Sequence, residues 1–139
     1  MMAAKTPRMT KTVLVVDDDA AIVRMLKDAI GLFRHEHAYT VVTAGDGADA
    51  LAALQRAPFD LVLLDLYMPR MCGLELLAHM RRLGLGIPVL LLTGNNDTGV
   101  AADALAGGIF ASIPKPLDLV RLEHLISLAI SQESPEVTP

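Results

Sequence analysis

Four places in the sequence carry residue types that can do chemistry, and each follows an apolar run. They are three consecutive aspartates at 17–19, Asp65, Thr93 and Lys115. Carboxylates provide the hard oxygen ligands that Mg²⁺ prefers, and no His or Cys stands near these positions to favour zinc. A hydroxyl and an ammonium group are suited to hold an anion. A metal, carboxylates, a hydroxyl and a lysine together indicate a site for phosphoryl transfer.

The stretches between these residues predict the elements that must position them. Continuous apolar, β-branched runs predict five strands, at 13–16, 40–44, 61–64, 88–92 and 109–113. Apolar residues at helical spacing predict helices over 20–33, 48–56, 74–83 and 97–106, and Asp118 is a suitable N-cap for a last helix. This alternation predicts an α/β fold, a five-stranded parallel sheet with helices on both faces.

The carboxyl ends of parallel strands meet at one edge of such a sheet, and ligands bind along that edge. The aspartates 17–19, Asp65, Thr93 and Lys115 follow the first, third, fourth and fifth strands. We therefore expect them to converge. Carboxylates held that close raise one another's pKa and destabilise the fold unless a cation lies between them.

Each of these residues also has an ordinary structural explanation. Asp19 can cap the helix that starts near residue 20, Thr93 alone suits a turn, and Lys115 alone suits a solvated surface. Taken singly, each ordinary explanation is the better one. Their coincidence at successive strand ends favours the functional interpretation.

Four motifs, in this order, make the chain similar to a known family. They are Val-Leu-Val-Val-Asp-Asp-Asp (13–19), Asp-Leu-Tyr-Met-Pro-Arg-Met-Cys-Gly (65–73), Leu-Leu-Thr-Gly (91–94) and Ile-Pro-Lys-Pro (113–116). From about residue 12 to 130 the chain resembles the receiver domain of bacterial two-component response regulators. The resemblance implies a flavodoxin-like fold with strand order 2-1-3-4-5. Residues 1–11 and 131–139 are expected to be flexible tails.

The resemblance implies a role for each residue at the strand ends. Asp65 would accept a phosphoryl group from a phosphohistidine and form an aspartyl phosphate. Thr93 would hydrogen-bond a phosphoryl oxygen, and Lys115 would pair first with Asp65 and then with the phosphoryl group. A cis peptide is expected between Lys115 and Pro116.

The same resemblance implies a Mg²⁺ site. Its ligands would be the carboxylates of Asp17, Asp18 and Asp65 and the main-chain carbonyl of Tyr67. Asp18 would be a direct ligand, and Asp17 would act partly through water.

The implied function is that of a signalling switch and not of an enzyme, apart from weak self-phosphorylation and autodephosphorylation. Its partners would be a sensor histidine kinase or phosphotransfer protein and a downstream protein, which docks on the face formed by the fourth helix, fifth strand and fifth helix. Family members usually carry a Tyr or Phe three residues before the lysine, and phosphorylation repositions that ring. Here the position is Ser112, and Phe110 is expected on the same side of the strand.

Composition excludes several other classes of protein. The net charge of −4 argues against a general nucleic-acid binder, and the single Cys excludes an internal disulfide. No apolar run is long enough for a membrane span or an export signal, so the cytoplasm is the expected compartment. The nine residues from Ser131 onward are too few for a DNA-binding module, so a receiver without an output domain is expected, with no direct nucleic-acid contact.

Three alternatives remain open. An aspartate-nucleophile phosphatase needs an acid/base Asp two residues after its nucleophile, where this chain has Tyr67. A receiver that binds its partner without phosphorylation is compatible with Ser112, although Asp65, Thr93 and Lys115 weigh against it. A flavodoxin-type cofactor site is disfavoured, because an acidic loop in place of a Ser/Thr-rich one repels a phosphate.

Tyr67 yields a first testable prediction, because its position influences hydrolysis of the phosphoryl group in the family. The bulk of Tyr67 should hinder the attacking water and lengthen the phosphorylated lifetime. Dephosphorylation should therefore be faster in Tyr67→Ala than in the wild type, as measured by loss of label over time. An unchanged rate would contradict this role.

Overall fold

The fold is seen in a computed structural model that describes residues 9–33, 37–68, 70–94, 99, 103 and 107–131. Its centre is a five-stranded sheet in the order β2-β1-β3-β4-β5, and every neighbouring pair is parallel. This confirms the expected topology. The strands are β1 (Met9–Val16), β2 (His37–Ala44), β3 (Leu61–Asp65), β4 (Val89–Thr93) and β5 (Ala111–Pro114).

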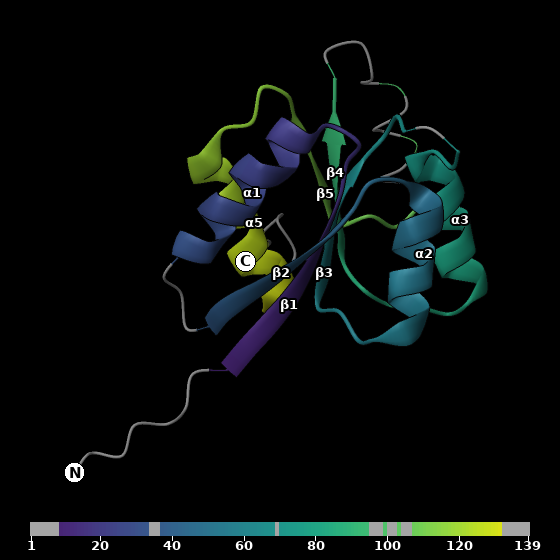
Figure 1. The fold of residues 1–139 in the computed structure, drawn as a ribbon, viewed down its shortest axis with the longest axis horizontal. Helices are drawn as coiled ribbons and strands as arrows, with labels where there is room; N and C mark the ends of the chain where they lie inside the picture. Colours follow the sequence, from purple (N-terminus) through teal and green to yellow (C-terminus); the bar gives the residue numbers. More distant parts are fainter. Residues whose placement is uncertain are drawn as a thin grey trace, which may run out of the picture.

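Helices cover both faces of the sheet. Figure 1 shows α1 (Ala20–Leu32) and α5 (Leu119–Ile130) on one side, and α2 (Gly47–Arg56) and α3 (Gly73–Arg82) on the other. The helix expected over residues 97–106 lies outside the described residues, apart from 99 and 103. Within the described part of the chain, no helix has the length and apolar character needed to cross a membrane.

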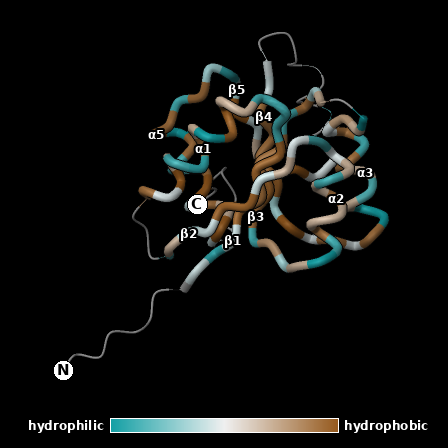
Figure 2. Tube along the Cα trace, in the orientation of Figure 1, coloured by the Kyte–Doolittle hydropathy of each residue, from teal (hydrophilic) through white to brown (hydrophobic). Residues whose placement is uncertain are grey.

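The sheet separates two hydrophobic clusters, and this explains the continuous apolar runs in the sequence. Successive strand residues point to opposite faces, so Leu14 and Val16 join the α2/α3 side while Val13 and Val15 join the α1/α5 side. All four are fully buried. Figure 2 shows the hydrophobic colour concentrated along these central strands. A strand covered on both faces needs apolar residues at every position, not at alternate ones.

Aspartates begin three of the helices. Asp19 Oδ1 accepts hydrogen bonds from the main-chain N–H of Ala21 at 2.9 Å and Ile22 at 3.4 Å. Asp118 caps α5 in the same way, as expected from the sequence. Asp46 caps α2 by accepting from the N–H of Asp49 at 2.8 Å. These caps satisfy N–H groups that have no partner within the helix.

The edge strand β2 and its neighbour β1 start earlier than the sequence indicates. β1 begins at Met9 and not at Val13, so residues 9–11, assigned above to a tail, belong to the strand. β2 begins at His37 and pairs with β1 along eight residues, from Met9↔His37 to Val16↔Ala44. β2 is an edge strand in which Ala44 alone is buried, so polar residues such as Thr40 are accommodated there, and the apolar pattern does not mark the strand ends. From residue 132 on, the expected C-terminal tail lies outside the described residues.

Gly73 allows α3 to start directly against the end of β3. Its N–H donates to the carbonyl of Leu66 at 2.9 Å. A Cβ atom at this position would lie 2.7 Å from the carbonyl oxygen of Asp65. Only a residue without a side chain therefore fits, and main-chain atoms cannot move aside as a flexible side chain would.

Gly73→Ala should accordingly lower the free energy of unfolding by about 1–3 kcal/mol. Urea denaturation measures this change. The matched control is Gly31→Ala in α1, where a Cβ meets nothing within 4 Å. That control should be neutral or stabilising by up to about 1 kcal/mol. Equal effects of the two substitutions would contradict the steric explanation.

Candidate functional site

The predicted site residues meet at the carboxyl edge of the sheet. Asp17 follows β1, Asp65 ends β3, Thr93 ends β4 and Lys115 follows β5. These four strands are successive neighbours in the sheet, in the order β1-β3-β4-β5. The parallel arrangement therefore brings together side chains that are up to 98 positions apart in the sequence, Asp17 and Lys115.

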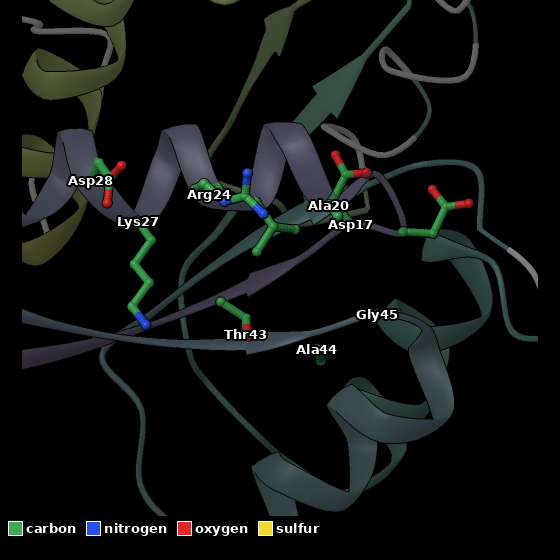
Figure 3. Close-up of a pocket in the computed structure, with 10 residues that line it drawn as sticks. Asp17, Ala20, Arg24, Lys27, Asp28, Thr43, Ala44 and Gly45 are labelled. Atoms are coloured by element: carbon green, nitrogen blue, oxygen red, sulfur yellow. The ribbon is translucent and has the colours of Figure 1, made fainter.

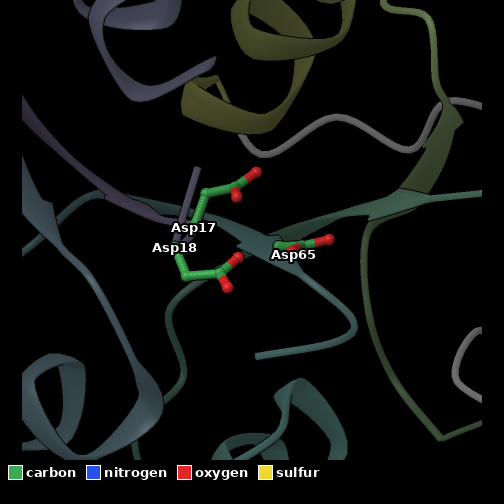
Figure 4. A group of neighbouring side chains, drawn as sticks. All are labelled: Asp17, Asp18 and Asp65. Atoms are coloured by element: carbon green, nitrogen blue, oxygen red, sulfur yellow. The ribbon is translucent and has the colours of Figure 1, made fainter. Parts of the chain in front are cut away.

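Three carboxylates form a cluster at this edge. Asp17, Asp18 and Asp65 each offer an oxygen within 4.8 Å of the others (Figure 4). Asp17 and Asp65 are buried, whereas Asp18 is exposed. The donor set consists of oxygen atoms alone and is open to solvent on the side of Asp18, which fits Mg²⁺.

Lys115 lies between the two buried carboxylates. Its Nζ is 3.2 Å from Asp65 Oδ1 and 3.4 Å from Asp17 Oδ2. Its main-chain N–H donates to the carbonyl of Thr93 at 2.7 Å, which fixes the segment after β5. The Lys115–Pro116 peptide bond is cis, as the family resemblance implies.

The site carries more negative than positive charge. Burial raises the pKa of Asp65, the charge of Asp17 raises it further, and Lys115 offsets the rise only in part. Burial alone would lower the pKa of Lys115, but the negative charges of Asp17 and Asp65 outweigh burial and raise it. Lys115 is therefore protonated, and the remaining negative charge favours an added cation.

Hydrogen bonds to the main chain orient Asp17. Its Oδ1 accepts from the N–H of Asp19 at 2.9 Å, and its own N–H donates to the carbonyl of Ala44 at 3.2 Å. Oδ2 remains for Lys115. Asp19 also caps α1, so the same residue orients the carboxylate of Asp17 through its N–H and begins the helix through its side chain.

Thr93 and Tyr67 lie at the same edge of the sheet as the carboxylate cluster but are exposed to very different extents. Thr93 is buried, and its Oγ1 donates to the carbonyl of Ile113 at 3.4 Å, a long contact. It lies at the site edge but makes its described hydrogen bond to β5. Tyr67 stands in the loop after Asp65, and 62% of its surface is exposed.

The sequence predicts Ser112 and Phe110 on one strand, but only Ser112 belongs to β5. Ser112 is half-buried within β5. Phe110 precedes the first residue of β5, so the alternation of a strand does not extend to it. Its side chain packs against the hydrophobic cluster on the α1/α5 side.

Sequence reasoning missed one pair next to the site. Arg70, in the loop after Asp65, forms an ion pair with Asp46 at the start of α2. The two residues are 24 positions apart. The Asp46-Gly47 pair signals a helix start, but nothing in the sequence links it to Arg70.

A cleft of about 500 Å³ between α1 and β2 opens next to the carboxylates. Asp17 and Asp18 line one end, and Arg24 and Lys27 line the wall that α1 provides. Figure 3 shows Lys27 reaching from α1 toward β2. The carboxylates can therefore be approached along this side of the molecule.

A comparison with protein families decides the identity of the domain. Residues 13–127 match the family described as "Response regulator receiver domain". The chain belongs to this family. The match covers the whole described sheet apart from the first residues of β1, and the CheY-like fold and parallel strand order agree with it.

Several receiver domains of known sequence are similar to this one. "Transcriptional regulatory protein GlrR" of Escherichia coli (strain K12) is 37% identical over 122 residues, which is 88% of this chain and 27% of that protein. "Probable transcriptional regulatory protein TcrX" of Mycobacterium tuberculosis is 38% identical over 108 residues, 78% of this chain and 44% of that protein. The chain thus spans about a quarter to under a half of these relatives.

Solved receiver structures superpose over most of the chain. The receiver domain of NtrX from Brucella abortus has a TM-score of 0.77 at 31% identity and covers 87% of this receiver and 99% of that chain. A response regulator receiver domain from Clostridium thermocellum has a TM-score of 0.78 at 26% identity and covers 88% and 95%. The receiver domain is therefore that of a two-component response regulator, generally a signalling protein.

The raised pKa of Asp65 makes stability depend on pH. Between the ordinary carboxyl value of 3.8 and the raised value, the folded receiver binds more protons than the unfolded chain. Stability is therefore lost as pH rises through this window. Asp65→Asn removes the buried charge, so it should be more stable than the wild type at pH 7 in the presence of a chelator.

The stability gain should shrink as pH falls toward 4, as measured by urea unfolding at a series of pH values. Asp60→Asn is the control, because Asp60 lies at the opposite edge of the sheet, where its Oδ2 accepts from the N–H of Thr12. A gain of the same size at every pH would contradict the electrostatic origin.

Proposed function

We propose that this receiver is a phosphorylatable switch in which Asp65 accepts a phosphoryl group from the phosphohistidine of a sensor kinase or phosphotransfer protein. The observation that supports this most is the placement of Asp65. It is a buried carboxylate with an ammonium group 3.2 Å away and two further carboxylates within 4.8 Å. Membership of the response regulator receiver family supports it independently.

In the proposed step, an oxygen of Asp65 attacks the phosphorus atom. The P–N bond breaks, its electron pair stays on the imidazole nitrogen of the partner, and that nitrogen takes up a proton from solvent. The product is an acyl phosphate on Asp65. The ammonium group of Lys115 already donates a hydrogen bond to Asp65 Oδ1. After transfer it can donate to a phosphoryl oxygen instead and stabilise the negative charge there.

Thr93 provides a second donor to the phosphoryl group. Its hydroxyl makes only a long contact of 3.4 Å with the carbonyl of Ile113, so the hydrogen bond that it would exchange is weak. Turning this hydroxyl toward a phosphoryl oxygen would break its hydrogen bond to Ile113 in β5. Thr93 thereby offers a link from the phosphoryl group to the face of β5.

Mg²⁺, when bound, neutralises charge on the phosphoryl oxygens. Asp17 and Asp18, together with the carbonyl of Tyr67, are the groups that we propose hold it, with Asp65 completing the set. The main-chain hydrogen bond from Asp19 keeps Asp17 in place, and Asp18 is exposed toward solvent. The excess of negative charge around Asp65 is consistent with a cation there.

The proposed output is a change in protein binding at the face that includes β5 and α5. Phosphorylation would shift an existing equilibrium between two shapes of that face. The fourth helix, which completes the proposed face, lies outside the described residues except for 99 and 103. We expect the switch to work in the cytoplasm.

GlrR and TcrX are named transcriptional regulatory proteins, but the match covers less than half of each. For the receiver itself, with a net charge of −4, we propose protein partners and no direct contact with nucleic acid.

A second candidate is a receiver that binds its partner without phosphorylation. The observation in its favour is Ser112, which is half-buried in β5 where the family usually has an aromatic ring. The two candidates differ in whether Asp65 becomes labelled.

Phosphoryl incorporation from a small-molecule phosphodonor tests the proposal. The wild type should be labelled in the presence of Mg²⁺ and not with a chelator, and Asp65→Asn should lose the label. Asp60→Asn, which removes the same charge at the opposite edge of the sheet, should be labelled like the wild type. An unlabelled but folded wild type would overturn the proposal and leave the binding-only receiver.

A further inference from the structure

The loop between Asp65 and α3 is tied to a neighbouring helix by a charged pair. Arg70 Nε donates to Asp46 Oδ2 at 2.8 Å, and a terminal guanidinium nitrogen donates to the same oxygen. That nitrogen is also 3.5 Å from Asp49 Oδ1. The guanidinium is therefore held by two carboxylates at the first turn of α2.

Asp46 is a firm anchor for this contact. Its side chain is 12% exposed, and its two oxygens have different partners. Oδ1 accepts from the N–H of Asp49 and caps α2, while Oδ2 receives Arg70. Hydrogen bonds from the Asp49 main chain and then from Arg70 lower the pKa of Asp46, so it is charged at neutral pH.

The main chain of Arg70 adopts an uncommon conformation. Its φ angle is +68°, in the left-handed region that residues other than Gly rarely occupy. Such a conformation persists where surrounding contacts over-determine it. The ion pair with Asp46 is such a contact, and it acts at the residue whose backbone turns the loop.

A second contact fixes the next residue of the loop. Met71 packs on Gly47, the first residue of α2, where a Cβ atom would lie 2.7 Å from both the Cβ and the carbonyl oxygen of Met71. Arg70 and Met71 thus dock the loop on α2 by charge and by close packing. A main-chain hydrogen bond from the N–H of Gly73 to the carbonyl of Leu66 joins the two ends of the loop.

We propose that Arg70 is a positioning residue, whose ion pair with Asp46 holds the described part of the loop after Asp65, residues 66–68 and 70–72, so that the Tyr67 carbonyl is available to Mg²⁺. This inference rests on the proposed function for the identity of the cation. Asp17 directly follows β1 and Asp65 is the last residue of β3, so the sheet fixes both carboxylates, whereas the Tyr67 carbonyl belongs to the loop. Its position therefore depends on what holds the loop, and Arg70 lies three residues away.

Mg²⁺ binding measured by isothermal titration calorimetry tests this role directly, without any phosphodonor. Arg70→Ala should weaken Mg²⁺ binding by about threefold to tenfold, less than the roughly tenfold to 100-fold typical of groups that contact a metal ligand directly. Asp46→Asn should weaken it similarly, because Asn keeps the helix cap but lacks the charge. Arg70→Lys should restore part of the affinity.

Two further variants separate the ion pair from general effects. The double variant Arg70→Ala/Asp46→Asn should bind no more weakly than either single variant, since both remove the same interaction. Arg56→Ala removes an equal charge at the far end of α2 and should bind like the wild type. Circular dichroism checks that each variant is folded.

Equal Mg²⁺ affinity of Arg70→Ala and Arg56→Ala would overturn the positioning role, as would additive losses in the double variant. A wild type that binds no Mg²⁺ would overturn it too. Failure of the proposed function has a different signature: the wild type binds Mg²⁺ and the variants weaken it as expected, but Asp65 is not labelled by a phosphodonor. In that outcome Arg70 positions a metal site that has another use.

Discussion

The sharing of one ammonium group by two buried carboxylates governs this structure. Asp17 and Asp65 both contact Lys115 Nζ, at 3.4 and 3.2 Å, and Asp18 adds a third negative charge nearby. Burying like charges together costs free energy, which the pair with Lys115 compensates only in part. The uncompensated negative charge favours binding of a cation at this edge of the sheet, where the three carboxylates lie close enough to hold one.

The rest of the fold supplies the rigidity that holds this charge in place. Two hydrophobic clusters pack on the sheet from both faces. β3, which ends at Asp65, is buried along its whole length, and so are the last four residues of β1, 13–16, which precede Asp17. Asp17 is further fixed through Asp19 and the start of α1. The loop after Asp65 is joined to α3 by the hydrogen bond between Leu66 and Gly73, and to the start of α2 by the ion pair between Arg70 and Asp46. The starts of three helices therefore hold either Asp17 or the loop that follows Asp65, which is how a marginally stable domain can hold a locally unfavourable arrangement.

The sequence predicted what depends on local pattern and missed what depends on distant contacts. Continuous apolar runs such as 61–64 identified strands buried on both faces, and the polar residues at the ends of four of the five strands indicated the edge where the candidate site lies. Asp19 and Asp118 were recognisable as caps because capping is local. The start of β1 at Met9 was not recognisable, because it follows from pairing with His37 on an edge strand. The Arg70–Asp46 pair could not be predicted either, because 24 positions separate the two residues and nothing in the sequence indicates that Arg70 adopts a positive φ angle.

The one-turn link from Asp17 through Asp19 into α1 has a consequence for the evolution and engineering of this domain. Because three residues between β1 and α1 both orient the carboxylate of Asp17 and cap the helix, the length of this connection is fixed, and insertion of a single residue would disrupt both contacts. The connection between α3 and β4, at the opposite edge of the sheet, carries no such burden. The exposed segment around Gly84 and Gly86, between α3 and β4, joins elements without touching the carboxylates. A reporter domain grafted there would leave the acidic edge accessible, whereas one grafted after β1 would not.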